Sequence, residues 1–64
     1  MIEQQMGPEL FDVCYGLIRK HRKIGTDDAI VFGELKHIVG KNNKTALNLC
    51  FQLDQVVFME NVSF

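Results

Sequence analysis

The stretch 31–55 constrains the fold of this chain more than any other, because it contains two helical patterns separated by a polar turn. Residues 32–39 predict a short helix, and the polar run KNNK at 41–44 predicts a tight turn. Apolar residues then return at helical spacing, which predicts a longer helix over about 43–55. The sequence therefore indicates a helix, a turn and a second helix at the centre of the chain.

The longer of these helices has one apolar and one polar face. The face that we expect to be buried consists of Ala46, Leu49, Cys50, Leu53 and Val57. The polar face consists of Lys44, Thr45, Asn48, Gln52 and Gln55. Either Asn42 or Asn43 can cap the first turn by accepting a backbone N–H. Beyond Gln55, the run 56–59 either extends the helix or becomes a strand that ends at 62–64, and its β-branched and aromatic residues favour the strand.

An amphipathic pattern before this stretch predicts another helix over about 8–23. Pro8 suits the first helical position, basic residues gather in the last turn, and Gly25 can end the helix in a left-handed conformation. The face expected to be buried consists of Leu10, Val13, Cys14, Leu17, Ile18 and His21. The face expected to be exposed consists of Glu9, Asp12, Gly16, Arg19, Lys20 and Lys23. Residues 1–7 predict a flexible tail, and His21 is expected to pack, partly buried, rather than to bind a ligand.

The segment between these patterns, residues 26–31, fits two conformations. Thr26 can cap a helix that begins at Asp27. The continuous apolar run 29–32 fits an extended stretch equally well, and we favour this reading, with the next helix beginning near residues 32–33. The inward-facing residues of that helix are expected to be Leu35, Ile38 and Val39, and the outward-facing ones Lys36 and His37.

Composition and charge exclude several classes of protein. The chain has 64 residues and 47% apolar content, which is typical of one small folded domain. Its net charge of −1 gives no overall attraction to nucleic acid or to anionic membranes. No apolar run approaches about 20 residues, so no membrane span is expected. The first residues lack the basic and apolar regions of a signal peptide, so we expect a cytoplasmic protein.

The two cysteines, Cys14 and Cys50, lack the CxxC spacing and the clustered histidines of a zinc site. We expect them to be small buried apolar residues in a reducing compartment, rather than metal ligands or a disulfide. The sequence also shows no Gly-rich phosphate loop, no paired carboxylates at an obvious site and no nucleophile beside a base. We therefore expect no enzyme activity, no metal and no cofactor.

Charge is distributed in three local groups. A first basic run, which we interpret as a solvated helix face, consists of Arg19, Lys20, Arg22 and Lys23. An acidic group follows, made of Asp27, Asp28 and Glu34. A second basic group surrounds the turn and consists of Lys36, His37, Lys41 and Lys44.

The pattern FGELKHIVG-KNNK-TALNLCFQLDQVVFME resembles the helix-turn-helix of winged-helix transcription regulators, including the MarR-like families, over about residues 30–60. The resemblance implies a mostly α fold over residues 8–64, a small three-helix winged-helix-like domain with a short or missing wing. Three positions depart from the family pattern. Val31 stands where a Ser or Thr cap is usual, Lys36 where a small residue lets the helices approach, and Lys41 where a small apolar residue follows the turn glycine.

The resemblance also implies double-stranded DNA as a partner, with residues 43–55 as the recognition helix. Asn48 and Gln52, one turn apart on its polar face, are then expected to contact base edges in the major groove. The residues expected to contact phosphates are Lys36, His37 and Lys41. Those expected to meet phosphate or base edges at the start of the recognition helix are Asn42, Asn43, Lys44 and Thr45.

A second strip of large apolar residues supports a different function. Leu47 and Phe51 lie beside the polar face rather than in the apolar stripe, and Phe58 lies further along the same side. On a small chain such a strip is typical of a protein contact. The alternative is therefore a protein-interaction module on the same scaffold, such as a small inhibitor or anti-repressor. A homodimer that buries these residues, or Phe58 and Phe64, is compatible with both hypotheses.

Overall fold

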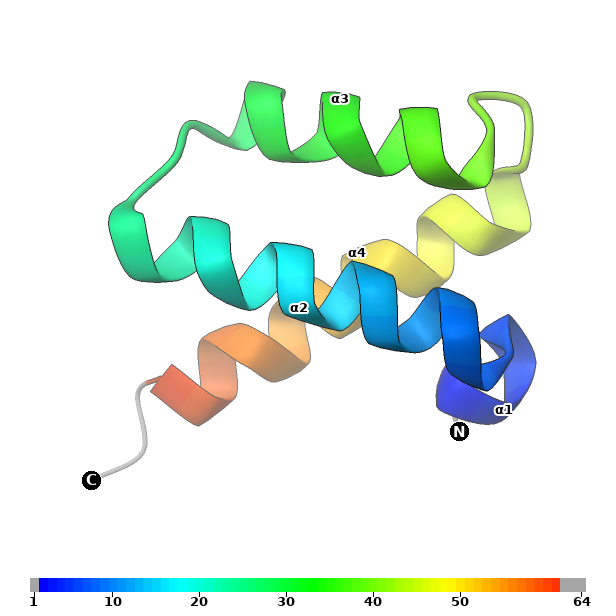
Figure 1. Ribbon diagram of the computed structural model, residues 1–64, viewed down its shortest axis with the longest axis horizontal. Helices are drawn as coiled ribbons and strands as arrows, with labels where there is room; N and C mark the ends of the chain where they lie inside the picture. Colours follow the sequence, from blue (N-terminus) through cyan, green and yellow to red (C-terminus); the bar gives the residue numbers. More distant parts are fainter. Residues whose placement is uncertain (1, 62–64) are drawn as a thin grey trace.

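The computed structural model describes residues 2–61, and these residues form helices joined by short turns, with no strand among them. The helices are α1 (Ile2–Met6), α2 (Pro8–Ile24), α3 (Asp28–Val39) and α4 (Lys44–Asn61). Helices α2, α3 and α4 all contact one another, and α1 packs against α2 and α4. In Figure 1, α3 lies beside α2, and α4 crosses obliquely behind α2. The predicted mostly α domain is confirmed.

Helix α2 agrees closely with the sequence prediction at both ends. Pro8 occupies the start, and Gly25 ends the helix at a φ of 75°, with its N–H donating to the carbonyl of His21. The side facing the core agrees with the prediction except at one residue. Val13 is exposed, whereas Phe11 and Tyr15 are partly buried against the core.

Residues Ile2–Met6 form a short helix where the sequence predicted a flexible tail over 1–7. Ile2 and Met6 are partly buried and pack against the core. The sequence prediction missed this contact because two apolar residues in a short polar segment carry no clear helical period. The helical packed domain therefore begins before residue 8.

Helix α3 begins earlier than the sequence predicted. It starts at Asp28, and the side chain of Asp27 caps it by accepting the N–H of Ala29 at 3.4 Å. The extended stretch favoured for 26–31 is therefore wrong, and the helical alternative is right apart from the cap, which is Asp27 rather than Thr26. The physical reason is burial, since Val31 lies one turn before Leu35 and both are fully buried.

The end of α3 follows the prediction, but one inward residue does not. The helix ends before Gly40, whose N–H donates to the carbonyl of Lys36 at 2.8 Å. Leu35 is buried and Val39 partly buried, as expected. Ile38 was expected to point inward and is exposed, because it lies toward the outer edge of the contact between α3 and α2.

Helix α4 is longer than predicted. Asn43 caps its start by accepting the N–H of Ala46 at 3.1 Å, as one of the two predicted caps. The strand favoured for 56–59 is wrong, because the helix continues to Asn61. Val57 continues the apolar stripe by one turn and is buried, which outweighs the β preference of this run. Residues 62–64 lie outside the described residues.

The core lies where α2, α3 and α4 meet. Its fully buried side chains are Cys14, Ile18, Val31, Leu35, Cys50, Leu53 and Val57. The apolar face predicted for α4 is confirmed, since each of its five residues is buried. Both cysteines are free thiols, and their sulfurs lie 3.9 Å apart at the contact between α2 and α4. The core thus determines which sides of the helices face outward.

Candidate interaction surfaces

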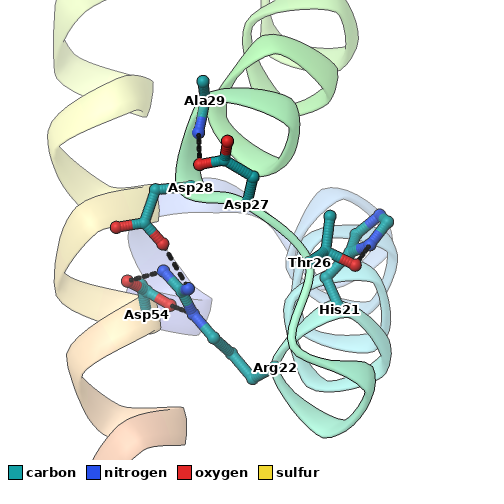
Figure 2. A network of polar contacts seen from close by, with 7 residues as sticks. All are labelled: His21, Arg22, Thr26, Asp27, Asp28, Ala29 and Asp54. Atoms are coloured by element: carbon teal, nitrogen blue, oxygen red, sulfur yellow. Dashed lines mark hydrogen bonds and ion pairs between the residues drawn. The ribbon is translucent and has the colours of Figure 1, made fainter.

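A network around Arg22 joins α2, α3 and α4, and Figure 2 shows it from close by. The guanidinium donates from Nε and Nη2 to the two carboxylate oxygens of Asp54, each at 2.8 Å. It also donates from Nη1 to Asp28 at the start of α3. The hydrogen bonds to Asp54 and then Asp28 raise the pKa of Arg22, so this side chain stays charged. Arg22 is therefore a structural residue and does not belong to a solvated basic face.

His21 links the end of α2 to α3. Its Nδ1 and the hydroxyl of Thr26 form a hydrogen bond of 2.8 Å, visible in Figure 2, and its Nε2 pairs with Glu34. The ring is mostly buried, in agreement with the expected packing role. Glu34 and Asp28, which the sequence placed in one acidic group, are thus engaged separately by two basic residues of α2.

Tyr15 connects α2 to the last turns of α4. Its hydroxyl donates to the carboxylate of Glu60, with distances of 2.8 and 2.9 Å to the two oxygens. The guanidinium of Arg19 lies 5.4 Å from the centre of the Tyr15 ring. The hydrogen bond between Tyr15 and Glu60 holds the C-terminal part of α4 against α2. The orientation of the outward side of α4 depends on this contact.

The residues that the sequence proposed for DNA contact are all exposed, and they surround the turn between α3 and α4. They are Lys36, His37, Lys41, Asn42, Asn43, Lys44, Thr45, Asn48 and Gln52. Lys36, His37 and Lys41 line a shallow hollow of about 450 Å³. The Asn43 side-chain oxygen is already engaged as the helix cap. Within residues 2–61, none of the three lysines of this group, at 36, 41 and 44, takes part in an ion pair.

The outward side of α4 changes from polar to apolar along its length. Its first half carries Lys44, Thr45, Asn48 and Gln52. From Phe51 onward it also carries four large apolar side chains, which we call the α4 apolar face: Phe51, Val56, Phe58 and Met59, with exposed fractions of 43, 44, 60 and 64%. Gln52 and Gln55 are exposed between them. Sequence reasoning missed Val56 and Met59, because it favoured a strand there. Phe64, another predicted interface residue, lies outside the described residues.

Two of the predicted interface residues are partly engaged within the chain. Phe51 packs edge-on against Phe32 of α3, with 4.9 Å between ring centres. Leu47 is half-buried beside the core. Among the predicted interface residues that the structure describes, Phe58 is therefore the most exposed.

The buried thiols lead to a prediction for alkaline pH. Burial raises the pKa of Cys50 from 9.0 to about 12, and it also raises the pKa of Cys14. Because the folded pKa is raised, the protonated thiols stabilise the fold fully below about pH 9, and this contribution is lost as the pH rises toward about 12. We expect the free energy of unfolding, measured in urea, to fall over this interval.

Tyr15 provides the control for that experiment, because its hydrogen bond to Glu60 raises its pKa above the ordinary value of 10.0, so Tyr15 also loses its proton only at alkaline pH. In the variant Tyr15→Phe the alkaline loss of stability is expected to persist. A variant whose stability no longer depends on alkaline pH would assign the effect to Tyr15 instead of the thiols.

The described residues contain neither a cluster of metal-binding side chains nor a membrane-spanning helix. No group of three or more His, Cys, Asp or Glu side chains in residues 2–61 is arranged to hold a metal ion. None of the described helices combines the length and apolar character needed to cross a membrane. Comparison with protein-family models, with curated proteins and with solved structures finds no match to this chain.

Proposed function

We propose that this chain is a small protein-interaction module that associates through the α4 apolar face. The observation that carries the proposal is the exposure of Phe51, Val56, Phe58 and Met59 along the part of α4 that begins at Phe51. Exposed apolar residues that occur singly need no explanation, but four large ones within nine residues of one helix, on a small domain, favour a binding surface. The opposite side of the same turns is already buried in the core, so this face is free to contact another molecule.

The partner that we propose for this face is a second copy of the chain. A two-fold interface brings the same surface of each copy together, so the surface must be compatible with itself. The α4 apolar face has no charge of its own, and the two carboxylates beside it on α4 are already engaged, Asp54 by Arg22 and Glu60 by the hydroxyl of Tyr15. A second copy would therefore bury aromatic and aliphatic side chains without isolating a carboxylate.

Sedimentation equilibrium tests this proposal. We expect the average mass of the wild-type chain to approach twice the monomer mass between micromolar and millimolar concentration. The variant Phe58→Ser is expected to weaken association at least tenfold, about 1.4 kcal/mol, because it removes a large exposed apolar contact. It should leave the helical content unchanged, since the Phe58 side chain is mostly outside the core.

The matched control is Asn48→Ser, which changes an exposed residue in the polar half of the same helix. This variant is expected to associate like the wild type. A wild-type chain that stays monomeric throughout, or a Phe58→Ser variant that associates normally, would contradict the proposal.

DNA binding is a second candidate function, supported by the other half of α4. Lys44, Asn48 and Gln52 are exposed beside the turn, and Lys36 and Lys41 carry charges that no described carboxylate compensates. In a helix-turn-helix, the first residues of the recognition helix contact base edges while neighbouring basic residues contact phosphates. The winged-helix resemblance belongs to this second candidate.

A titration of the ¹⁵N-labelled chain with a mixed-sequence DNA duplex at low salt tests the second candidate. If the chain binds DNA, backbone amide shifts should concentrate between residues 41 and 52 and weaken as salt is added. The variant Lys44→Glu is expected to abolish the binding by placing a negative charge next to a phosphate, while leaving self-association intact. Unchanged DNA affinity in this variant would contradict the groove assignment.

A further inference from the structure

A second apolar surface lies between α2 and α3, away from the α4 apolar face. Here the two helices leave a groove of about 390 Å³, whose apolar lining comes from Leu17 on α2 and from Ala29, Ile30, Gly33 and Ile38 on α3. Ile30 is 56% exposed although it is a large aliphatic residue. Both isoleucines lie on the α3 wall, two turns apart, so the groove is apolar along most of the helix.

The α2 wall continues this apolar character beyond the groove itself. Val13, Leu17 and Ile24 follow one another at intervals of one or two turns along the same side of α2, and Val13 and Ile24 are exposed. The groove is thus bordered by one apolar stripe on each helix. Two such stripes side by side form the surface on which a further helix packs in a helical bundle.

The shape and chemistry of the groove favour a helical occupant over an extended one. An extended peptide brings unpaired backbone N–H and C=O groups, and the walls of this groove are helices whose backbone groups are already paired within each helix. A helix satisfies its own backbone hydrogen bonds and presents an apolar side to such a groove. The occupant of an apolar groove between two helices is therefore expected to be an amphipathic helix.

The charge around the groove indicates which polar residues the bound helix carries. The groove continues into the hollow lined by Lys36, His37 and Lys41, and the two share Gly33 and His37. Glu34, the carboxylate on the groove wall, is already paired with His21. The two positive charges of Lys36 and Lys41 exceed the one negative charge of Glu34, so the net charge at this end of the groove is positive. DNA would gain nothing from the isoleucines, whereas a helix with an apolar stripe and acidic residues matches both parts of the surface.

We propose that the groove between α2 and α3 binds an amphipathic helix of a partner protein whose acidic residues pair with Lys36 and Lys41. The proposal rests on the proposed function only in taking the chain as a protein-binding module, since it concerns a different surface from the α4 apolar face. It reassigns the basic residues near the turn from phosphates to carboxylates.

The test uses a synthetic helical peptide of about 18 residues, with leucines at helical spacing along one side and three glutamates in the neighbouring turn. It is titrated into the ¹⁵N-labelled full chain. We expect amide shifts at Leu17, Ile30 and Ile38 together with Lys36 and Lys41. A peptide with glutamine in place of the three glutamates should bind at least tenfold more weakly. Shifts confined to α4, no shifts at all, or equal binding of both peptides would overturn the proposal.

Variants locate the site and separate this proposal from self-association. Ile30→Gln and Lys41→Gln each change an exposed residue, so both should fold, and each is expected to weaken binding of the glutamate peptide at least fivefold. Val56→Gln on α4 is expected to bind the peptide normally while associating less with itself. If the chain is monomeric but binds the peptide, only the proposal of self-association is contradicted. If the chain forms a dimer but does not bind the peptide, only the proposal of a helix-binding groove is contradicted. If Ile30→Gln binds the peptide like the wild type, the groove assignment is overturned.

Discussion

The substitution Leu53→Ala is expected to lower the free energy of unfolding by about 3 kcal/mol, within the range measured for truncation of buried leucines. Leu53 is almost completely buried, in the middle of α4 where this helix meets the rest of the core. Removing its side chain loses apolar burial and leaves a cavity that the neighbouring helices fill only in part. Because a domain of 64 residues has little stability in reserve, much of the folded population should be lost at room temperature.

Urea unfolding followed by circular dichroism at 222 nm measures this loss. The matched control is Met59→Ala, on the same helix but mostly exposed, for which we expect a change below about 0.5 kcal/mol when both variants are measured at a concentration where the chain is monomeric. Equal losses in the two variants would contradict the placement of Leu53 in the core and Met59 on the surface.

The second large effect is expected for Arg22→Met, which keeps most of the side-chain stem but removes the guanidinium. Asp54 then loses two hydrogen bonds while only 18% of its side chain is exposed, so a poorly solvated carboxylate is left without its partner. Breaking a buried ion pair from one side costs several kcal/mol, and for this partly exposed pair we expect a loss of about 2 kcal/mol. Thermal or urea unfolding at neutral pH measures it.

Two further variants test the reason for that loss. Asp28→Asn removes the more exposed carboxylate of the network and is expected to change stability by less than about 1 kcal/mol. The double variant Arg22→Met with Asp54→Leu is expected to recover part of the loss, because no carboxylate remains to be desolvated. If Asp28→Asn is the more damaging single change, the ranking of the two carboxylates is wrong.

The sequence was sufficient to predict the elements whose helical period is clear. The regular return of Cys14 and Ile18, and of Leu49, Cys50 and Leu53, identified the central buried residues of α2 and α4. The ends of α2 followed from Pro8 and Gly25, whose backbone preferences are local. These features depend only on residues within one helix, so the local sequence was sufficient to predict them.

The missed features depend on packing between helices. The runs 29–32 and 56–59 are rich in β-favouring residues, yet Val31 and Val57 become buried only if each run is helical. The β preference of these residues alone therefore predicted the wrong conformation. The ion pair between Arg22 and Asp54 joins residues that are far apart in the sequence, and nothing near either residue indicates the other.

The exposed surfaces could be predicted only in part, because some of them also depend on packing between helices. Polar residues around the turn and Phe51 and Phe58 beside them could be placed outside the core from helical spacing alone. The groove between α2 and α3 combines Leu17 with Ile30, and it exists only because the two helices lie side by side. Ile38 was expected in the core, so its part in an exposed groove could not be foreseen.

The contact between two copies through the α4 apolar face is tested most directly by isotope-filtered nuclear Overhauser spectroscopy. A mixture of ¹³C-labelled and unlabelled chain, at a concentration where the wild type sediments as a dimer, reports contacts only between copies. We predict signals from the Phe58 ring of one copy to the methyl groups of Val56 or Met59 in the other. Contacts between copies that involve only residues 36–45, with none from Phe58, would contradict the assignment of α4 as the association surface.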